Sequence, residues 1–438
     1  MIRSTLTCVA LASVALGAVA AGAQLLPGGL GALPGQLVGG ALQPVTGSVP
    51  VLGSVASSLE SPRLLEGLDS ASLFDLRRQR LRTLVHDNRR VLDADDKGNP
   101  IRRGEIILLD PAPALVATAL GKGFSRLRGE DVPGLGISLV VLAPPRGKDA
   151  EDGLKTLRKL DPDGQYEVNH VFEPAGGALG PSAGATSDGR LSTNVASMGM
   201  IDGGVASHPA LAHALIEQRG FAPSGPRASG HGTAIASLLV GVDGAFRGAA
   251  PGASLLVADV YGGEPAAGSA ELIVRGLGWL VERRVKVVTI SLVGPPNRLL
   301  ERAVQAAQAK GVLIVAAVGN DGPAAPPQYP ASYPGVIAVT GVDSHDRALL
   351  EAGRAAHLDF AAPGAEMAAA LPGQGYASVR GTSFAAPLVA ARLALASSGG
   401  RGALGVVSAE AVPGKGKVGQ GIVCRPCRIE PKLVIAKK

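Results

Sequence analysis

Between residues 195 and 424, short apolar segments alternate with longer amphipathic ones, and this alternation restricts the possible folds more than any other feature of the sequence. Short segments rich in β-branched residues predict strands at 195–201, 254–261, 285–292, 312–318 and 336–340. Longer segments predict helices at 234–240, 270–283, 299–310 and 383–396. Strands that alternate with helices usually pair in parallel. We therefore predict an α/β fold with a parallel sheet and helices on both of its faces.

The first residues of the chain have the pattern of a secretory signal peptide. Arg3 precedes an apolar run from Leu6 to about Val19, and small residues then lead up to Ala23. Because such a run is short for a bilayer span, we predict a signal peptide at residues 1–23 that is removed after Ala23; the alternative is an uncleaved anchor. No later segment predicts a stable membrane span. The protein is therefore expected to be secreted, periplasmic or extracellular, and its composition is typical of a bacterial protein.

Two segments of different character follow. Residues 24–66 contain glycine and proline without a helical or strand period, which predicts a linker. Residues 67–103 contain an Arg-rich helical segment in which leucines and arginines recur at helical spacing: Leu73, Leu76, Leu81, Leu84 and Val85, with Arg77, Arg78, Arg80, Arg82, Arg89 and Arg90 around them. Such a helix could contact a membrane or an acidic partner, but we favour packing of its apolar side on the neighbouring domain.

Residues 104–178 predict a small, separate α+β unit. The expected strands are 105–110, 136–142 and 166–172, and the expected helices are 114–127 and 149–160. The unit has no candidate nucleophile, no cluster of metal ligands and no phosphate-binding loop. The residues that follow, 179–194, are rich in glycine, alanine and serine, and they predict an exposed, cleavable connection.

Four polar residues of the α/β region lie where strands end or helices begin. Asp202 and Asn320 each follow a predicted strand. His231 lies between glycines at a helix start, where there is room for a substrate backbone and the helix dipole favours a neutral, basic imidazole. Ser383 also begins a helix, whose backbone N–H groups would face an oxyanion formed on attack. Each residue alone could be a turn or capping residue, but the four together predict a nucleophilic site.

The blocks around these residues resemble the subtilisin (subtilase) family of serine proteases, in which Asp, His and Ser occur in this order. The matching blocks are 200–205, 229–233, 316–320 and 381–387, supported by 208–209, 250–253, 329–331 and 362–364. The resemblance implies a serine endopeptidase whose catalytic domain, at 195–424, has a subtilisin-like sheet and acts through an acyl-enzyme. Ser383 would attack the peptide carbonyl, His231 would take up its proton, and Asp202 would orient His231. Asn320 would donate to the oxyanion together with the Ser383 N–H.

The resemblance also implies which residues contact a substrate. Four would pair with its extended backbone and three would form a wall of the pocket for the residue before the cut: Ser291, Leu292, Val293 and Gly294, then Ala317, Val318 and Gly319. Most subtilases carry glycine in place of Val293. Since its isopropyl group would narrow the pocket, we expect a preference for small or medium apolar side chains. No carboxylate cluster matches the calcium sites of many relatives, so no cofactor is expected to be required, and a role for calcium stays open.

The α+β unit at 104–178 resembles the subtilase propeptide, a prodomain of ferredoxin-like fold that helps the protease to fold and inhibits it. A parallel sheet built from long-range contacts folds slowly, so a folding template is physically reasonable. Residues 170–175 would occupy the substrate cleft, and self-processing is expected between Glu173 and Asn194. The implied partners are polypeptide substrates and the chain's own propeptide. An alternative is a catalytically silent binding protein on the same scaffold.

Charge and cysteine content bear on the remaining classes of protein. A net charge of +6 with 3% aromatic residues argues against nucleic-acid binding. A basic surface-binding module would rest only on the Arg-rich helix and on the basic tail at 425–438. Cys8 would leave with the signal peptide, and Cys424 and Cys427 alone cannot complete a four-ligand zinc site. We therefore predict a local disulfide between these two cysteines.

Overall fold

The computed structural model describes residues 69–175, 196–398 and 402–435. Contacts divide the chain into two units, Met1–Val49 and Pro50–Lys438, and every described residue belongs to the second unit. The predicted signal peptide, the linker at 24–66 and the cleavable connection at 179–194 lie outside the described residues.

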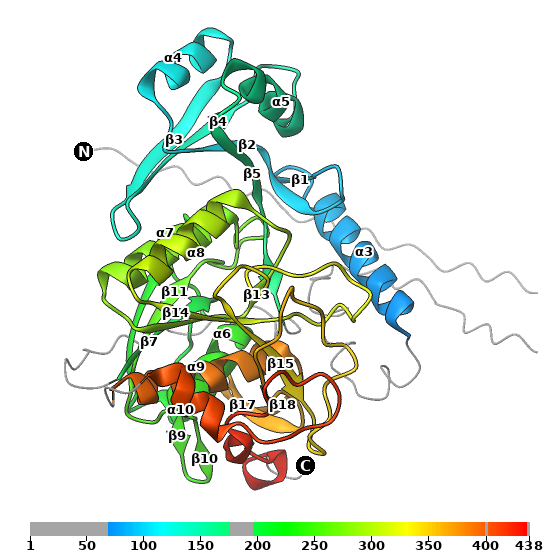
Figure 1. Cartoon of the computed structure of the whole chain (residues 1–438), viewed down its shortest axis with the longest axis vertical. Coiled ribbons are helices and arrows are strands. Elements are labelled where there is room, and N and C mark those ends of the chain that lie inside the picture. Colours follow the sequence, from blue (N-terminus) through cyan, green and yellow to red (C-terminus); the bar gives the residue numbers. More distant parts are fainter. Residues whose placement is uncertain (1–68, 176–195, 399–401, 436–438) are drawn as a thin grey trace, which may run out of the picture. The chain divides into compact units, whose positions relative to one another are not determined.

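A seven-stranded parallel sheet forms the centre of the catalytic region, as the alternation of strands and helices predicts (Figure 1). In spatial order its strands are β16 (Phe360–Pro363), β15 (Ile337–Val342), β14 (Leu313–Ala317), β12 (Val287–Ile290), β7 (Ser197–Asp202), β11 (Ser254–Asp259) and β8 (Leu215–Gly220). The five predicted strands are confirmed. The two edge strands are not among them, because β8 is only partly buried and rich in polar residues, and β16 has only four residues and ends in proline.

Helices cover both faces of this sheet, which confirms the predicted fold class. They are α6 (Gly230–Val240), α7 (Ala270–Glu282), α8 (Arg298–Ala309), α9 (Thr382–Ser398) and α10 (Ala403–Glu410). In β11, Leu256 and Ala258 belong to the core formed with α7 and α8. Their neighbours Leu255 and Val257 belong to the core formed with α6 and α9. Burial on both faces explains why the central strands are continuous apolar runs.

The unit before the catalytic region has the βαββαβ order of a ferredoxin-like fold, as predicted. It consists of β2 (Pro100–Leu109), α4 (Pro113–Gly121), β3 (Ser125–Val132), β4 (Ile137–Ala143), α5 (Ala150–Leu160) and β5 (Gln165–His170). The four strands form an antiparallel sheet in the order β5-β2-β4-β3. A further short strand, β1 (Leu92–Ala94), pairs with the start of β2. We refer to this unit as the prodomain.

One predicted element of the prodomain is wrong. The helix expected at 114–127 ends at Gly121, and residues 125–132 form the strand β3 instead. Gly123 lies in the left-handed region, with φ +91°, and it turns the chain away from the helix. β3 lacks the alternating pattern of a half-buried strand because it lies at the sheet edge and almost all of its side chains are exposed. The segment 67–103 also extends beyond a helix, since it contains β1 and the start of β2.

The Arg-rich segment forms the helix α3 (Ser70–Asp87). Three of its leucines are buried: Leu73, Leu81 and Leu84. Leu84 packs with Val171, which follows β5, and with Ala266 of the catalytic region. The apolar side of the helix therefore packs on the rest of the protein, in line with the favoured interpretation of this segment.

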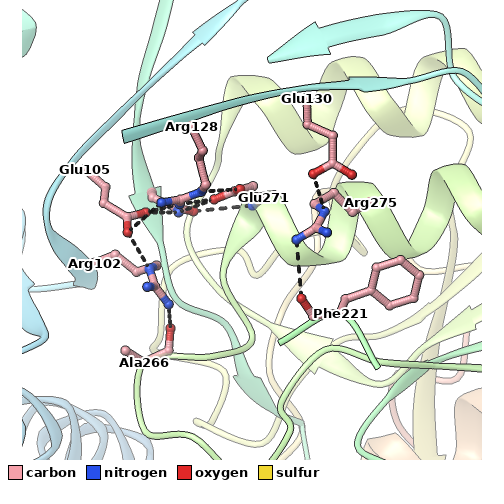
Figure 2. A network of polar contacts seen from close by, with 9 residues as sticks. Arg102, Glu105, Arg128, Glu130, Phe221, Ala266, Glu271 and Arg275 are labelled. Carbon is pink, nitrogen blue, oxygen red and sulfur yellow. Dashed lines mark hydrogen bonds and ion pairs between the residues drawn. The ribbon is translucent and has the colours of Figure 1, made fainter. Parts of the chain in front are cut away.

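A network of charges, in which the carboxylates are buried and Arg128 is partly exposed, joins the prodomain to α7 (Figure 2). Arg128 of β3 lies between Glu105 of β2 and Glu271 of α7, with its Nε 2.7 Å from Glu271 Oε1. Asn169 of β5 donates to both carboxylates. Burial alone would raise the pKa of Glu105, but its bonds to Arg128 and other cationic neighbours outweigh burial and lower it. Removal of Arg128 would leave the buried Glu271 without its cation and Glu105 with Arg102 alone, so the network favours the docked prodomain.

The described C-terminal residues are attached to the catalytic region. Cys424 and Cys427 form a disulfide, which confirms the prediction. Beyond it, Ile429 is buried against Ala210 and Phe246, so part of the segment at 425–438 packs on the domain instead of forming a free tail. Within the described ranges, no helix is both long and apolar enough to cross a membrane.

Candidate active site

The structure brings Asp202, His231 and Ser383 together at the carboxyl edge of the parallel sheet. Asp202 is the last residue of β7, and His231 and Ser383 are the second residues of α6 and α9. His231 Nδ1 lies 2.8 Å and 2.9 Å from the two carboxylate oxygens of Asp202, and His231 Nε2 lies 3.0 Å from Ser383 Oγ. All three side chains are buried. They form a continuous hydrogen-bonded chain from a carboxylate to a hydroxyl.

The glycines beside these residues allow close packing within the protein. A Cβ at Gly232 would lie 2.1 Å from the carbonyl oxygen of Gly203, and a Cβ at Gly203 would lie 2.3 Å from Ser229 Oγ. The start of α6 therefore packs directly against the turn that follows Asp202. Gly232 thus has a different role from the expected one of making room for a substrate backbone: it lets His231 approach Asp202.

Ser291, which is expected to bind the substrate backbone, also supports the nucleophile. Pro387 lies one turn after Ser383 in α9 and has no N–H to donate to the Ser383 carbonyl. Ser291 Oγ donates to that carbonyl instead, at 3.0 Å. The backbone carbonyl of Ser291 accepts a hydrogen bond from Ala175 N at 2.8 Å. Ser291 therefore holds the start of α9 and contacts the chain in the cleft at the same time.

Asn320, the expected second donor to an oxyanion, lies beside the start of α9. Its Oδ1 accepts a hydrogen bond from Thr382 N at 3.0 Å. Its Nδ2 donates to the carbonyl oxygen of Ala175. The Thr382 hydroxyl accepts from Gly319 N at 3.1 Å, which ties the Asn320 loop to the start of α9. The side-chain amide is therefore oriented before any reaction takes place, as electrostatic stabilisation of a transition state requires.

The segment that follows the prodomain lies in the cleft, as predicted for residues 170–175. The strand β6 (Glu173–Pro174) pairs antiparallel with β13 (Leu292–Val293). On the other side of the same segment, Phe172 N donates to the carbonyl of Gly268 at 2.9 Å. Residues 172–175 are therefore held by main-chain hydrogen bonds on both sides, which is how an extended peptide binds by strand addition.

Ala175 fills the pocket expected for the residue before the cut. It is buried and belongs to the same core as Val293 and Ala317. Val293 Cγ1 lies 3.3 Å from the place that a Cβ at Gly319 would occupy, so the isopropyl group lies at the wall of this pocket. Val318 differs from expectation, because its side chain belongs to the core on the other face of the sheet and does not pack with Ala175.

Gly294 contacts the chain three residues before Ala175. A Cβ at Gly294 would lie 2.5 Å from the ring of Phe172, so only glycine leaves the space that this ring fills. Phe172 is fully buried in the same core as Leu292. The Tyr261 hydroxyl donates to the Phe172 carbonyl at 2.9 Å. The cleft therefore binds an aromatic side chain here as well as the small one of Ala175.

Asp259 is a buried carboxylate next to the site that sequence patterns do not single out. It ends β11, in register with Asp202 at the end of β7. Its oxygens accept hydrogen bonds from the N–H groups of Arg227 at 2.7 Å and of Tyr261 and Gly262 at 2.9 Å. Burial is the main reason that the pKa of Asp259 is raised; the three donors oppose this shift and the charge of Asp202 adds to it. Its position at a strand end is the one signal that could have drawn attention to it.

The helix α3 also reaches the cleft, which its sequence does not predict. Arg80 Nη2 lies 3.1 Å from Glu173 Oε2 and 3.1 Å from Asp321 Oδ1. Arg77 Nε lies 2.9 Å from Asp321 Oδ2. Burial alone would lower the pKa of Arg80, but the two carboxylates outweigh burial and raise it. The spacing of Arg77 and Arg80, three residues apart on one side of a helix, is the available signal, and it indicates only a charged face.

Carboxylates outside the cleft pair mainly with arginine. Glu351 lies 2.8 Å from Arg380, and Glu410 lies 2.9 Å from Arg392. In the part of the chain that the structure describes, no group of three or more His, Cys, Asp or Glu side chains is arranged to hold a metal ion. No calcium site can therefore be named among these residues.

Comparisons with known proteins agree with this geometry. Residues 194–410 match the Subtilase family, peptidase S8. The Major intracellular serine protease of Bacillus subtilis (strain 168) is 39% identical over 207 residues, which cover 44% of this chain and 65% of that protein. M-protease of Shouchella clausii (strain KSM-K16) is 32% identical over 272 residues, which cover 61% of this chain and 69% of that protein. Fervidolysin from Fervidobacterium pennivorans, a keratinolytic enzyme related to subtilisin, has a crystal structure that matches with a TM-score of 0.60 and 19% identity over 76% of this chain and 61% of its own.

A hydrogen-bonded Asp–His–Ser chain beside an amide donor, at the carboxyl edge of a parallel sheet, defines the subtilisin class of serine proteases. The chain belongs to the subtilase family and is a subtilisin-like serine endopeptidase. The likeness to fervidolysin supports the fold alone. The chain spans 65% and 69% of the length of the two relatives that it matches.

Proposed function

We propose that this protein is a secreted endopeptidase, made as a precursor, that cuts its own chain after Ala175. The observation that carries this proposal is the way residues 172–175 bind. Their main chain pairs with β13, and the Ala175 carbonyl accepts a hydrogen bond from Asn320 Nδ2. A carbonyl bound in this way is placed for attack. The proposal narrows the expected processing region, 173–194, to a single bond.

In the proposed reaction, Ser383 Oγ attacks the carbonyl carbon and passes its proton to His231 Nε2, 3.0 Å away. Asp202 accepts from His231 Nδ1–H, which leaves Nε2 free to accept and stabilises the imidazolium. Asn320 Nδ2 and the N–H at the start of α9 stabilise the oxyanion. When the C–N bond breaks, His231 gives its proton to the leaving amine. A water molecule then loses a proton to His231 Nε2 and attacks the acyl carbon. As the bond from that carbon to Ser383 Oγ breaks, His231 returns the proton to Oγ and the acyl group leaves as a carboxylic acid.

We also propose that polypeptides are the substrates, that the propeptide is an intramolecular inhibitor, and that no cofactor is required. The nucleophile, the base and the oxyanion donors of the reaction are all supplied by the chain. The propeptide fills the positions of a substrate, and the network around Arg128 attaches it to α7. A cut segment that stays bound would keep the enzyme latent until the fragment is released.

Two features support secretion. The pattern of residues 1–23 is that of a signal peptide. The disulfide between Cys424 and Cys427 is of a kind that persists in oxidising compartments outside the cytoplasm.

Mass spectrometry of the protein recovered from the periplasm and the medium is expected to find two fragments. One would begin at Gln24 and end at Ala175, and the other would begin at Gly176. A serine-directed phosphonate should label Ser383 in the second fragment once the first has been released, because labelling needs both an active nucleophile and an open cleft.

The alternative, a silent binding protein on the same scaffold, leads to a different result. It predicts an intact chain after Gln24 and no covalent label at Ser383. A cut at a bond other than the one after Ala175 would show that the observed register is not the one used in processing.

Val293→Gly is expected to relax the selection for a small residue before the cut. In the wild type, peptides with alanine there should be cut faster than matched peptides with phenylalanine or arginine, since Val293 and Ala317 pack around Ala175. Removal of the isopropyl group widens the pocket, so the ratio of kcat/KM for alanine over phenylalanine peptides should fall by roughly tenfold. Val293→Ala should fall between the two. A wild-type preference for arginine or phenylalanine would contradict the narrow pocket.

A further inference from the structure

Asp321 is a carboxylate beside the cleft that the proposed reaction does not use. It follows the oxyanion donor Asn320, and its side chain is only 5% exposed. Two guanidinium groups of α3 cover it: Arg77 Nε lies 2.9 Å from Oδ2, and Arg80 Nη2 lies 3.1 Å from Oδ1. In the precursor, both oxygens of this carboxylate are therefore paired with cations from outside the catalytic region.

Arg80 also binds the side chain of the third residue before the proposed cut. With Ala175 as the first residue, Glu173 is the third, and its two oxygens lie 3.2 Å and 3.1 Å from Arg80 Nε and Nη2. One guanidinium nitrogen thus bridges Glu173 and Asp321. The bridged oxygens lie no more than about 6 Å apart, a distance at which like charges repel in a partly buried site. Glu173 is compatible with this place only while Arg80 is present.

A cut after Ala175 places these groups on different fragments. Both arginines and Glu173 lie before the cut, and Asp321 lies after it. Release of the propeptide therefore takes away the cations that pair with Asp321. An arginine or lysine at the third position of a substrate is longer than glutamate, so its cationic end can reach the place that Arg80 leaves.

We propose that Asp321 makes the mature enzyme select polypeptides with arginine or lysine at the third residue before the scissile bond and disfavour glutamate or aspartate there. This rests on the proposed function, because it takes the register of residues 172–175 as that of a substrate. The same geometry accounts for release of the propeptide: once α3 moves away, its own Glu173 carboxylate faces Asp321 without a cation.

The first test uses the self-processed enzyme and three peptides, Val-Phe-X-Pro-Ala-Gly, in which X is arginine, glutamine or glutamate. We expect kcat/KM to be about tenfold or more higher for the arginine peptide than for the glutamate peptide, with glutamine between them. In Asp321→Asn the ratio of arginine to glutamate should fall to within about twofold of one, because the charge that discriminates is gone. Glu217→Gln, which removes a carboxylate of β8 paired with Arg283, is the matched control and should keep the wild-type ratio.

The outcomes of this test separate the two proposals. An arginine-to-glutamate ratio near one in the wild type, or a ratio that Asp321→Asn leaves unchanged, overturns the role of Asp321. Failure to cut the neutral glutamine peptide between alanine and glycine overturns the proposed function instead.

A second test does not depend on catalysis. In the full chain carrying Ser383→Ala, amide hydrogen exchange reports how firmly residues 171–175 are bound. Arg80→Gln should speed their exchange by roughly tenfold, because Glu173 then faces Asp321 unpaired. Adding Glu173→Arg should restore slow exchange, since the new guanidinium reaches Asp321 directly.

Two further variants test whether the effects depend on Asp321 and on Arg80 in particular. Adding Asp321→Asn should make the rescue incomplete, because the repulsion is removed but the carboxylate that receives the new guanidinium is gone. Arg78→Gln removes an exposed arginine of the same helix that pairs with Asp75, and it should leave the exchange unchanged. If Glu173→Arg fails to restore protection, or restores it equally well in Asp321→Asn, Asp321 does not recognise the third residue.

Discussion

Full-length protein carrying Ser383→Ala is expected to remain an unprocessed precursor after removal of its signal peptide. Loss of the hydroxyl removes the acyl-enzyme route, and in subtilisin itself such a loss costs on the order of 10⁶-fold in kcat. The fold should be retained, because the change removes one oxygen and the start of α9 is still held through the Ser383 carbonyl by Ser291. Intact-mass measurement of the secreted protein gives the result directly.

Ser254→Ala is the matched control for this experiment. Ser254 is a buried serine at the first residue of β11, at the end of the strand opposite to the catalytic edge. This variant should be processed like the wild type. His231→Ala should be as severe as Ser383→Ala, and the double variant should be no worse than either, because the residues act as one unit. A Ser383→Ala protein trimmed after Ala175 like the wild type would show that another protease makes the cut.

The part of the fold that could be predicted from sequence is the part whose burial leaves a local pattern. All six residues of β11 are buried, and the four between Ser254 and Asp259 form a continuous apolar run. The edge strands β8 and β3 carry polar side chains because β8 is only partly buried and β3 is mostly exposed, so neither resembles a buried strand in sequence. What makes them strands is the neighbour with which each pairs, and no local pattern encodes that neighbour.

In the candidate site, too, local sequence predicts some residues and misses others. Asp202, His231 and Ser383 could be found because each lies in a short block at a strand end or helix start. The contacts of α3 could not be found, because Arg80 is 93 residues from Glu173 and 241 residues from Asp321. Ion pairs over such separations depend on how the prodomain docks. The role of Gly232, next to His231, could not be assigned from the sequence either. Close packing within the protein and close approach of a substrate backbone both require glycine at such a position.

Asn320→Ala in the processed enzyme is expected to lower kcat by roughly 10²–10³-fold with little change in KM, a magnitude established for subtilisin itself. The reason lies in the geometry. Thr382 N fixes Asn320 Oδ1 at 3.0 Å, and Nδ2 donates to the oxygen of Ala175. That oxygen becomes negatively charged in the transition state, and a hydrogen bond to a charged acceptor is stronger than one to a carbonyl. Initial rates on a neutral peptide, per competent active site, measure the loss.

Asn320→Ala removes both the N–H donor and most of the side-chain volume, and Asn320→Asp removes the donor alone. The carboxylate keeps the outline of the amide and can still accept from Thr382 N, but it has no N–H to donate and it adds negative charge beside the oxyanion. It should therefore be at least as slow as Asn320→Ala. If Asn320→Ala raised KM and kept kcat, Asn320 would bind the ground state as well as the transition state. A rate in Asn320→Ala far below that of Asn320→Asp would instead indicate a displaced α9, because only the alanine variant leaves Thr382 N without its acceptor.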